Sequence, residues 1–276
     1  MQSSAPAAIT TGDEIPASRR FFRRIKSGFF RSAALYRLYL KCKYGRCVTD
    51  GLSAGLPNGV LQSRAEWQEA TKTGKRLHLP LHRSDEKNWD HLAAVRAIVG
   101  VTPKTACVLD AGAEFYSNVL PALFLCGYQH LYGMNLSFTD PARRGPIQYL
   151  PGDITHTGFA DGIFDAITCM SVIEHGVPLK PYFEEMYRLL KPGGILITST
   201  DYYPEPINTR NKVAHSAPIK IFTRQEARDI ISLAHGAGFE STGPIDLECS
   251  GPTVRWDIYG LEYSFLIFTL RKPVFN

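Results

Sequence analysis

Residues 108–116 have the sequence VLDAGAEFY, in which an apolar run ends at Asp110 and Gly112 follows two positions later. The apolar segment after this stretch is long enough for a helix. The order predicts a strand over 106–110, a tight glycine turn and a helix over about 116–126. Open α/β sheets bind ligands at the carboxyl ends of their strands, and a glycine there lets a ligand approach the backbone. We therefore expect a binding site at this turn.

Short apolar runs and helical segments continue to alternate downstream of the turn. They predict an α/β fold that is Rossmann-like, with a mostly parallel seven-stranded sheet, helices on both faces and an antiparallel last strand. A KPGG sequence at 191–194 is expected to end one helix before the next strand begins. The predicted strands are 106–110, 130–135, 147–150, 164–170, 195–200, about 239–247 and 262–271, and the predicted helices after the turn are 116–126, 179–190 and 223–235.

The chain divides into three parts by composition. Residues 1–17 are small, polar and proline-containing, which is typical of a flexible tail. Residues 18–100 form a basic, helical N-terminal extension, and residues 101–276 form the Rossmann-like domain. Within the extension, Ser84 is expected to cap a helix that runs to about Val99.

Residues 18–44 have apolar side chains at three- or four-residue steps, with basic residues between them. This pattern predicts a basic amphipathic helix. Such a helix can lie on an anionic membrane surface, or it can dock on its own domain or on a partner protein. Both alternatives stay open at this point.

Charge and cysteine content limit the compartment and the partners. The formal net charge is +5, and the six cysteines form no C-x-x-C pair, so a zinc site is not expected. No apolar run reaches the roughly 20 residues that cross a bilayer. We expect a cytoplasmic protein in a reducing compartment, with peripheral contact to the inner face of the membrane as an open addition. No RNA-binding motif is visible, so nucleic acid is not an expected partner.

Several motifs, taken in order, resemble those of class I S-adenosylmethionine-dependent methyltransferases. The sequence DAGAE at 110–114 is similar to their first motif. FDAI at 164–167 and SVIEH at 171–175 resemble the fourth-strand motif of the type 11 subgroup, and LLKPGG at 189–194 precedes the fifth strand as it does there. The C-terminal part looks most like methyltransferases linked to bacterial polysaccharide synthesis.

The resemblance implies S-adenosylmethionine as the cofactor. Asn135 stands where relatives carry an acidic residue that binds the ribose, and Asp153 and Ile154 stand where relatives contact the adenine. The implied cofactor-binding residues are Asp110, Gly112, Glu114, Asn135, Asp153, Ile154 and Ser171. We also expect that Gly112→Arg prevents cofactor binding without unfolding the protein.

Methyl transfer to oxygen or nitrogen needs alignment of the reactants and often a base. Polar residues that follow the fourth and fifth strands are candidates for these tasks. Ser171 replaces the first glutamate of an E-x-x-E-H metal motif found in some relatives, so no metal site is expected. The candidate catalytic residues are Glu174, His175 and Asp201, and the candidate substrate residues are Tyr202, Tyr203, Arg210 and His215.

The expected function is O-methylation of a glycan or a related small acceptor. The alternative is a catalytically degenerate scaffold protein tethered by its basic helix, because Glu114 and Asn135 both depart from the family pattern. An NAD-dependent oxidoreductase is disfavoured, since the G-x-G-x-x-G fingerprint is missing.

Overall fold

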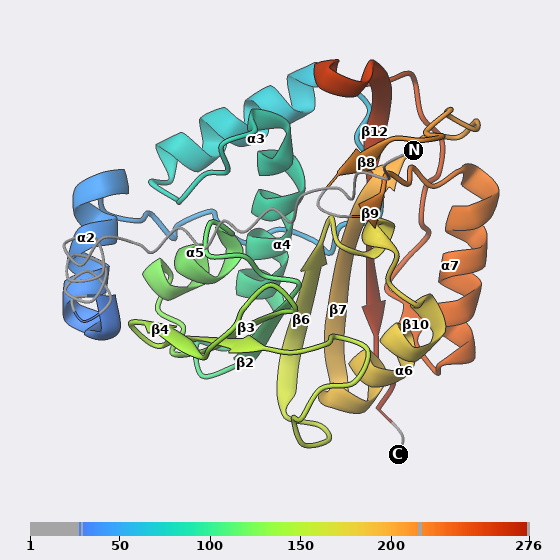
Figure 1. Cartoon of the computed structure of the whole chain (residues 1–276). Helices are drawn as coiled ribbons and strands as arrows, with labels where there is room; N and C mark the ends of the chain where they lie inside the picture. The colour runs from blue at the N-terminus through green and yellow to red at the C-terminus, as the bar shows by residue number, and fades with distance from the viewer. Residues whose placement is uncertain (1–27, 29, 215–216, 275–276) are drawn as a thin grey trace, which may run out of the picture.

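The computed structural model describes residues 28, 30–214 and 217–274. Its central feature is a sheet with the strand order β1-β12-β7-β6-β2-β3-β5-β4 (Figure 1). The five strands from β7 to β5 are parallel neighbours, and β12 is antiparallel to β7, so the predicted Rossmann-like α/β fold is confirmed. The main strands are β2 (Cys107–Ala111), β3 (His130–Asn135), β5 (Ile147–Pro151), β6 (Phe164–Met170), β7 (Leu190–Tyr202) and β12 (Leu261–Arg271).

Shorter strands extend this sheet within the described residues. The strands β1, β10 and β11 all pair with β12, and β4 pairs with β5. The strands β8 and β9 pair only with each other. Their bounds are β1 (Gly59–Val60), β4 (Ala142–Arg144), β8 (Val213–Ala214), β9 (Ala217–Pro218), β10 (Glu240–Ser241) and β11 (Val254–Trp256).

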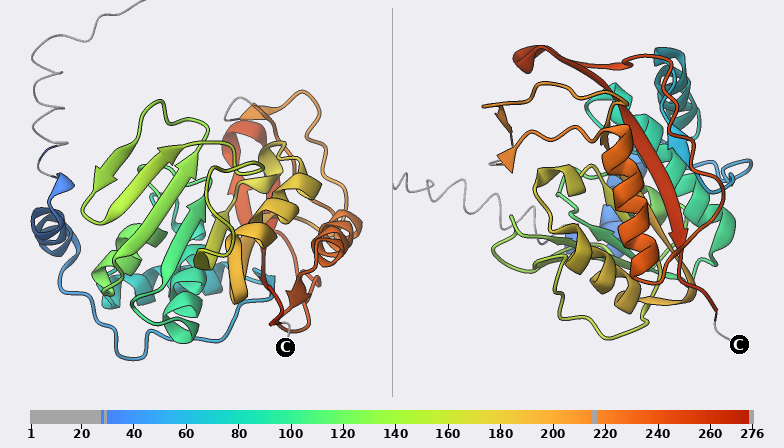
Figure 2. Two further views of the ribbon diagram at one scale, coloured as in Figure 1. Left: turned by 90° about the horizontal axis from the view of Figure 1, so that it is seen from below. Right: turned by 90° about the vertical axis from the view of Figure 1, so that its right-hand side faces the viewer.

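Helices cover both faces of the sheet (Figure 2). On one face lie α4 (Asn88–Val101) and α5 (Val119–Leu125), and α3 (Arg64–Arg76) and α2 (Ala33–Tyr44) pack against them in turn. On the other face lie α6 (Leu179–Leu189) and α7 (Arg224–Gly236).

Adjacent strand residues supply the hydrophobic cores on the two faces of the sheet. Val108 belongs to the core beneath α4 and α5, whereas Leu109 belongs to the core beneath α6 and α7. Successive side chains of a strand point to opposite faces, so a strand covered on both sides is apolar throughout. This explains why the central strands read as continuous apolar runs.

The N-terminal extension is joined to the sheet. In β1, Gly59 pairs with Ile267 of β12, and Val60 pairs with Leu266. The backbone N–H of Leu61 then donates to the carbonyl of Phe265 at 2.9 Å. Further along, the α4 residues Ala94, Ala97 and Ile98 are fully buried in the same core as the strand residues Val108 and Ile195.

The structure corrects several predicted boundaries. The side chain of Ser84 makes no capping hydrogen bond, because the chain enters α4 through the 3₁₀ helix η1 (Asp85–Lys87). The KPGG sequence lies inside β7, which begins at Leu190 and pairs there with Phe164. Only residues 240–241 of the predicted late strand 239–247 form a strand.

The predicted helix 18–44 is only partly within the described residues. Its second half is α2, whereas residues 18–27 lie outside the described part of the chain. Within the described ranges, no helix combines the length and apolarity that a bilayer crossing needs.

Candidate active site

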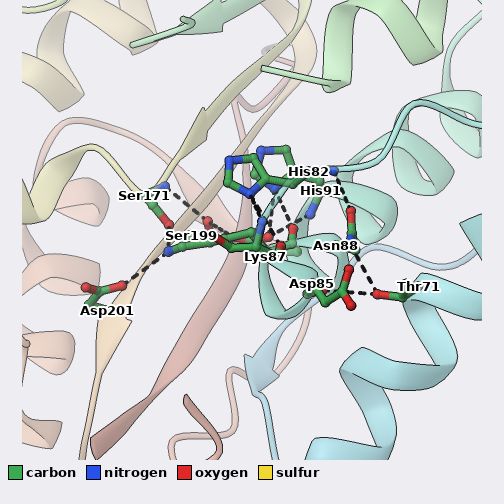
Figure 3. Close-up of polar contacts among 11 residues, drawn as sticks. Thr71, His82, Asp85, Lys87, Asn88, His91, Ser171, Ser199 and Asp201 are labelled. Carbon is green, nitrogen blue, oxygen red and sulfur yellow. Dashed lines mark hydrogen bonds and ion pairs between the residues drawn. The ribbon is translucent and has the colours of Figure 1, made fainter. Parts of the chain in front are cut away.

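Charged and polar side chains gather where β6 and β7 end, beside the first turn of α4 (Figure 3). The strands position them because the carboxyl ends of neighbouring parallel strands meet at one edge of the sheet. The members are Lys87, Asp90 and His91 from η1 and α4, Ser171 and Glu174 after β6, and Ser199, Thr200 and Asp201 of β7.

Lys87 lies at the centre of this cluster. Its Nζ donates to Ser171 Oγ at 2.6 Å and to Asp201 Oδ1 at 3.3 Å, and it lies 3.8 Å from the centre of the Phe265 ring. Ser171 is held in a left-handed conformation, with φ of +53°, and its N–H donates to the Ser199 carbonyl at 3.0 Å. The ammonium therefore links the ends of β6 and β7.

The charges around Lys87 keep it protonated. Burial opposes its charge, but the carboxylates of Asp201 and Asp90 outweigh that effect and raise the pKa of Lys87. The cluster thus contains a permanent internal cation, which favours ionisation of neighbouring carboxyl groups.

Glu174 has the opposite tendency. Its side chain is buried, and Oε2 accepts a hydrogen bond from Thr200 Oγ1 at 3.0 Å. Burial, followed by the charge of Asp201, raises the pKa of Glu174 to about 8. Burial also raises the pKa of Asp201, against the opposing effect of Lys87. At neutral pH, Glu174 therefore holds a proton while Lys87 and Asp201 form an ion pair.

A second polar group adjoins the first through β7. Ser199 Oγ donates to Asp90 Oδ2 at 2.6 Å, and His91 Nδ1 lies 2.9 Å from Asp90 Oδ1. Burial opposes charge on both partners, but their mutual attraction raises the pKa of His91 and lowers that of Asp90. The His82 ring stacks on His91 at 5.4 Å, and burial lowers the pKa of His82 to about 4. His82 is therefore neutral at physiological pH.

The side chain of Val172 packs against the glycine turn, which the sequence did not predict. Gly112 has φ of +86°, and a Cβ added there would lie 2.4 Å from Val172 Cγ2. The side chain of Val172 thus packs against Gly112 on the side to which a Cβ would point. A side chain at position 112 would have to displace Val172, so Gly112→Arg also carries a steric cost for the fold, and the expectation that it prevents cofactor binding without unfolding the protein stays a prediction. Asp110, just before the turn, accepts from Thr168 Oγ1 at 2.7 Å, and burial raises its pKa to about 6.

Asn135 and Glu114 meet at Ser137. The Asn135 amide donates to the Gly112 carbonyl at 2.9 Å, and its oxygen accepts from the Ser137 N–H at 2.8 Å. The Ser137 hydroxyl donates to Glu114 Oε1 at 2.8 Å. The carboxylate of Glu114 therefore lies close to Asn135, whose amide is uncharged.

The ends of β3 and β5 are tied together, since the Gly152 N–H donates to the Asn135 carbonyl at 3.2 Å. Asp153 is exposed and accepts from the N–H and hydroxyl of Thr155, while Ile154 is buried. Leu136 is 75% exposed at the same edge. The sequence analysis did not predict Leu136 as a site residue, although an apolar residue directly after Asn135, the polar last residue of β3, indicates an apolar contact at this edge.

The predicted substrate residues do not all reach this edge. Tyr202 is buried in the core beneath α6 and α7, and its hydroxyl donates to the Leu247 carbonyl at 2.6 Å. It faces away from Asp201 because adjacent strand residues point to opposite sides. Tyr203 is half-buried, Arg210 is exposed in the following loop, and His215 lies outside the described residues.

His175 is half-buried in the short 3₁₀ helix η2 (Ile173–His175), directly after Glu174. It lies in sequence beside the cluster, and its role as a base stays a prediction.

Lys87, Asp90 and His91 were not predicted as site residues. Their signal is helical spacing: positions 87, 90, 91 and 94 share one face of a helix, and Ala94 on that face is fully buried. Charged residues on a face that becomes apolar one turn later indicate a buried polar cluster. Among the described residues, no group of three or more histidine, cysteine, aspartate or glutamate side chains is arranged to hold a metal ion.

Residues 110–198 match the family model described as "Methyltransferase domain". This part of the chain is therefore similar to methyltransferase domains. Its Rossmann-like sheet agrees with the class I architecture that the motifs implied, and the matched range contains Gly112, Asn135, Asp153 and Glu174.

Two curated relatives are similar to parts of the chain. The sterol 24-C-methyltransferase of Candida albicans is 26% identical over 119 residues, which are 40% of this chain and 31% of the relative. The demethylmenaquinone methyltransferase of Paenarthrobacter aurescens is 39% identical over 62 residues, 22% of this chain and 24% of the relative. The chain thus spans less than a third of the length of each.

Solved structures are similar at lower identity. An S-adenosylmethionine-dependent methyltransferase from Mesorhizobium loti has a TM-score of 0.47 and 16% identity, covering 67% of this chain and 97% of that one. The YcgJ protein of Bacillus subtilis has a TM-score of 0.48 and 15% identity, covering 63% and 95%.

Proposed function

We propose that the protein transfers a methyl group from S-adenosylmethionine to a small acceptor. The observation that carries the proposal is the methyltransferase-domain match, whose range holds the polar and apolar groups at the ends of β2, β3 and β5. These groups have the chemical variety that an adenosine-containing cofactor needs: acceptors for hydroxyl groups and an apolar surface for a base.

The cofactor would be held mainly by residues at the ends of β3 and β5. The Glu114 carboxylate and the Asn135 amide oxygen can accept hydrogen bonds from ribose hydroxyls, since each oxygen has two lone pairs. The exposed side chain of Leu136 offers an apolar contact for the adenine ring, and Asp153 can accept from its amino group. Glu114 thus supplies the charge that Asn135 lacks.

When bound, the cofactor supplies an activated methyl group on a sulfonium. The protein has to align the acceptor and, for a hydroxyl acceptor, remove its proton. Glu174 can perform the second task only when it is ionised, which its pKa of about 8 makes more frequent at mildly alkaline pH, and the same raised pKa makes that carboxylate a stronger base than an ordinary glutamate. Lys87 pairs with Asp201 and donates a hydrogen bond to Ser171, so we assign Lys87 a positioning role.

For the acceptor, we propose a glycan hydroxyl or a related small molecule, as the motif resemblance suggested. The names of the two curated relatives add a sterol and a demethylated menaquinone to the acceptors that should be tested. A degenerate scaffold is the competing function, and Val172 packed on Gly112 is the observation that favours it.

Isothermal titration calorimetry of the purified chain with S-adenosylmethionine, S-adenosylhomocysteine and NAD tests the proposal. We expect micromolar binding of the first two and none of NAD. Glu114→Gln and Leu136→Glu should each weaken binding at least tenfold, whereas Glu240→Gln, in the distant β10, should leave it unchanged. If a folded sample releases no heat with any of the three compounds, the scaffold function replaces this one.

A second assay addresses the acceptor. The protein is incubated with S-adenosylmethionine that carries a radiolabelled methyl group, in the presence of glycan, sterol or quinol acceptors. Label in the glycan fraction supports the proposed acceptor. Label in the sterol or quinol fraction would show that the acceptor is a sterol or a quinol instead.

A further inference from the structure

The helix α2 has two apolar faces, and among the described residues only one of them is covered. Tyr36 and Leu40 are buried, and the Tyr36 ring stacks on Phe124 of α5 with the ring centres 5.8 Å apart. On the other face, Leu35 and Leu38 are exposed, Leu38 by 55%. The covered face fixes the helix to the body of the protein, so the second face is presented outward.

The outward face is a continuous stripe. At 100° per residue, the exposed residues Leu35, Leu38, Tyr39 and Cys42 fall within about 100° of one another around the helix axis. Figures 1 and 2 place α2 at the flank of the molecule, away from α6 and α7. The stripe is therefore accessible to a large, flat partner.

Basic residues border the stripe on both sides. By the same helical geometry, Lys41 lies on one side of it and Lys43 on the other, and both are exposed. Residues 18–49 carry ten lysine or arginine residues and no acidic residue, so the rest of the chain has a net charge of −5. The positive charge is thus concentrated on the segment that contains α2.

We propose that the outer face of α2 docks on the surface of an anionic lipid bilayer. An apolar stripe with a lysine on each side is an arrangement found in helices that lie in the membrane interface, where long basic side chains reach the headgroups. Nucleic acid would use the charges but leave Leu35 and Leu38 without a function. This proposal does not depend on the methyl acceptor or on cofactor binding.

Vesicle sedimentation with the full-length protein tests it. The probes are phosphatidylcholine vesicles with and without phosphatidylglycerol, each at low and high salt. We expect binding only to the vesicles with phosphatidylglycerol, weakened by salt because surface charge is screened. No sedimentation with either vesicle overturns the proposal.

Paired variants separate the stripe from non-specific attraction. Leu38→Glu should abolish binding, whereas Ile258→Glu, which changes an 86% exposed residue outside α2, should not. Lys41→Glu with Lys43→Glu should weaken binding more than twentyfold, since each basic residue near the surface contributes roughly fivefold. The control pair Lys72→Glu and Lys75→Glu, on exposed positions of α3, should have a much smaller effect.

Circular dichroism first has to show that Leu38→Glu melts like the parent protein. Three further results would then contradict the proposal. Vesicle binding that Leu38→Glu does not change would show that charge alone acts. A dimer in light scattering that Leu38→Glu dissociates, without vesicle binding, would show that a second copy covers the stripe. RNA binding that depends on Lys41 and Lys43 but not on Leu38, again without vesicle binding, would assign the surface to nucleic acid.

Discussion

Val172 and Gly112 form a tightly fitted pair at the residue scale, since an added Cβ would lie only 2.4 Å from Val172 Cγ2. Gly112→Ala should therefore lower the free energy of unfolding by about 2–4 kcal/mol, through its positive φ and through the clash. Urea denaturation measures the loss. In a double-mutant cycle, Val172→Ala should relieve the clash, so that the double variant is less destabilised than the sum of the single variants. Strict additivity would mean that the two side chains do not compete for this space.

Glu174 predicts a pH dependence of stability. Its pKa is about 8 in the folded protein, above the model-peptide value of about 4.3, so the folded state binds more protons between these values. The contribution of Glu174 to stability is complete below about pH 4 and is lost as the pH rises through about 8. Glu174→Gln should make the free energy of unfolding fall less between pH 5 and pH 8, by on the order of 2 kcal/mol. Urea titrations across this range test it, with the exposed Glu69→Gln as the control. An unchanged pH slope would contradict the buried, protonated state of Glu174.

The sequence located the residues of the glycine turn and of the two strand ends, but not their partners. Ser171, Glu174 and Asp201 were named because each follows an apolar strand. Lys87 was not, because its position in the cluster depends on how α4 packs across the sheet. Tyr202 was placed on the ligand side, although the alternation from the buried Asp201 directs its ring to the opposite core.

The N-termini of η1 and α7 differ in their capping at the scale of elements. The Thr223 hydroxyl oxygen accepts a hydrogen bond from the Glu226 N–H, and the Glu226 carboxylate accepts one from the Thr223 N–H. The two bonds form a capping box at α7. Thr223→Ala should lower the free energy of unfolding by about 1 kcal/mol. Ser84→Ala is the matched control, since the Ser84 side chain makes no capping bond, and it should change stability by less than about 0.5 kcal/mol. Chemical denaturation of both variants checks the difference, and equal losses would refute it.

Most strands and helices of residues 101–276 were predicted to within a few residues, because their apolar periods are strong and their turns contain glycine or proline; the late strand 239–247 and the start of β7 are exceptions. The short strand β1 was not predicted. Its two residues, Gly59 and Val60, have no pattern of their own, and their extended conformation comes from pairing with β12. Tertiary contacts of this kind leave no local signal.

For the whole molecule, the shared core predicts that residues 101–276 do not fold alone. Such a fragment lacks Leu61, Ala94, Ala97 and Ile98, which are all fully buried. Removing α4 exposes the sheet face that holds Val108 and Ile195. We expect the fragment to aggregate or to lack a cooperative thermal transition, whereas the full chain unfolds in one. Circular dichroism and size-exclusion chromatography test this, and a monomeric fragment with a sharp transition would show that the extension is dispensable.

The pairing of β1 with β12 also determines when this edge of the sheet can form during protein synthesis. Gly59 and Ile267 are neighbours in the sheet, yet about two hundred residues of synthesis separate them. At roughly 5–20 residues per second, the ribosome needs on the order of 10–40 s to deliver the partner strand. During that interval, residues 59–61 have no strand to pair with, and the apolar face of α4 has only part of its sheet. The protein therefore completes this part of its fold only after β12 has been synthesised, and until then its unpaired apolar segments are exposed to chaperones that bind such segments.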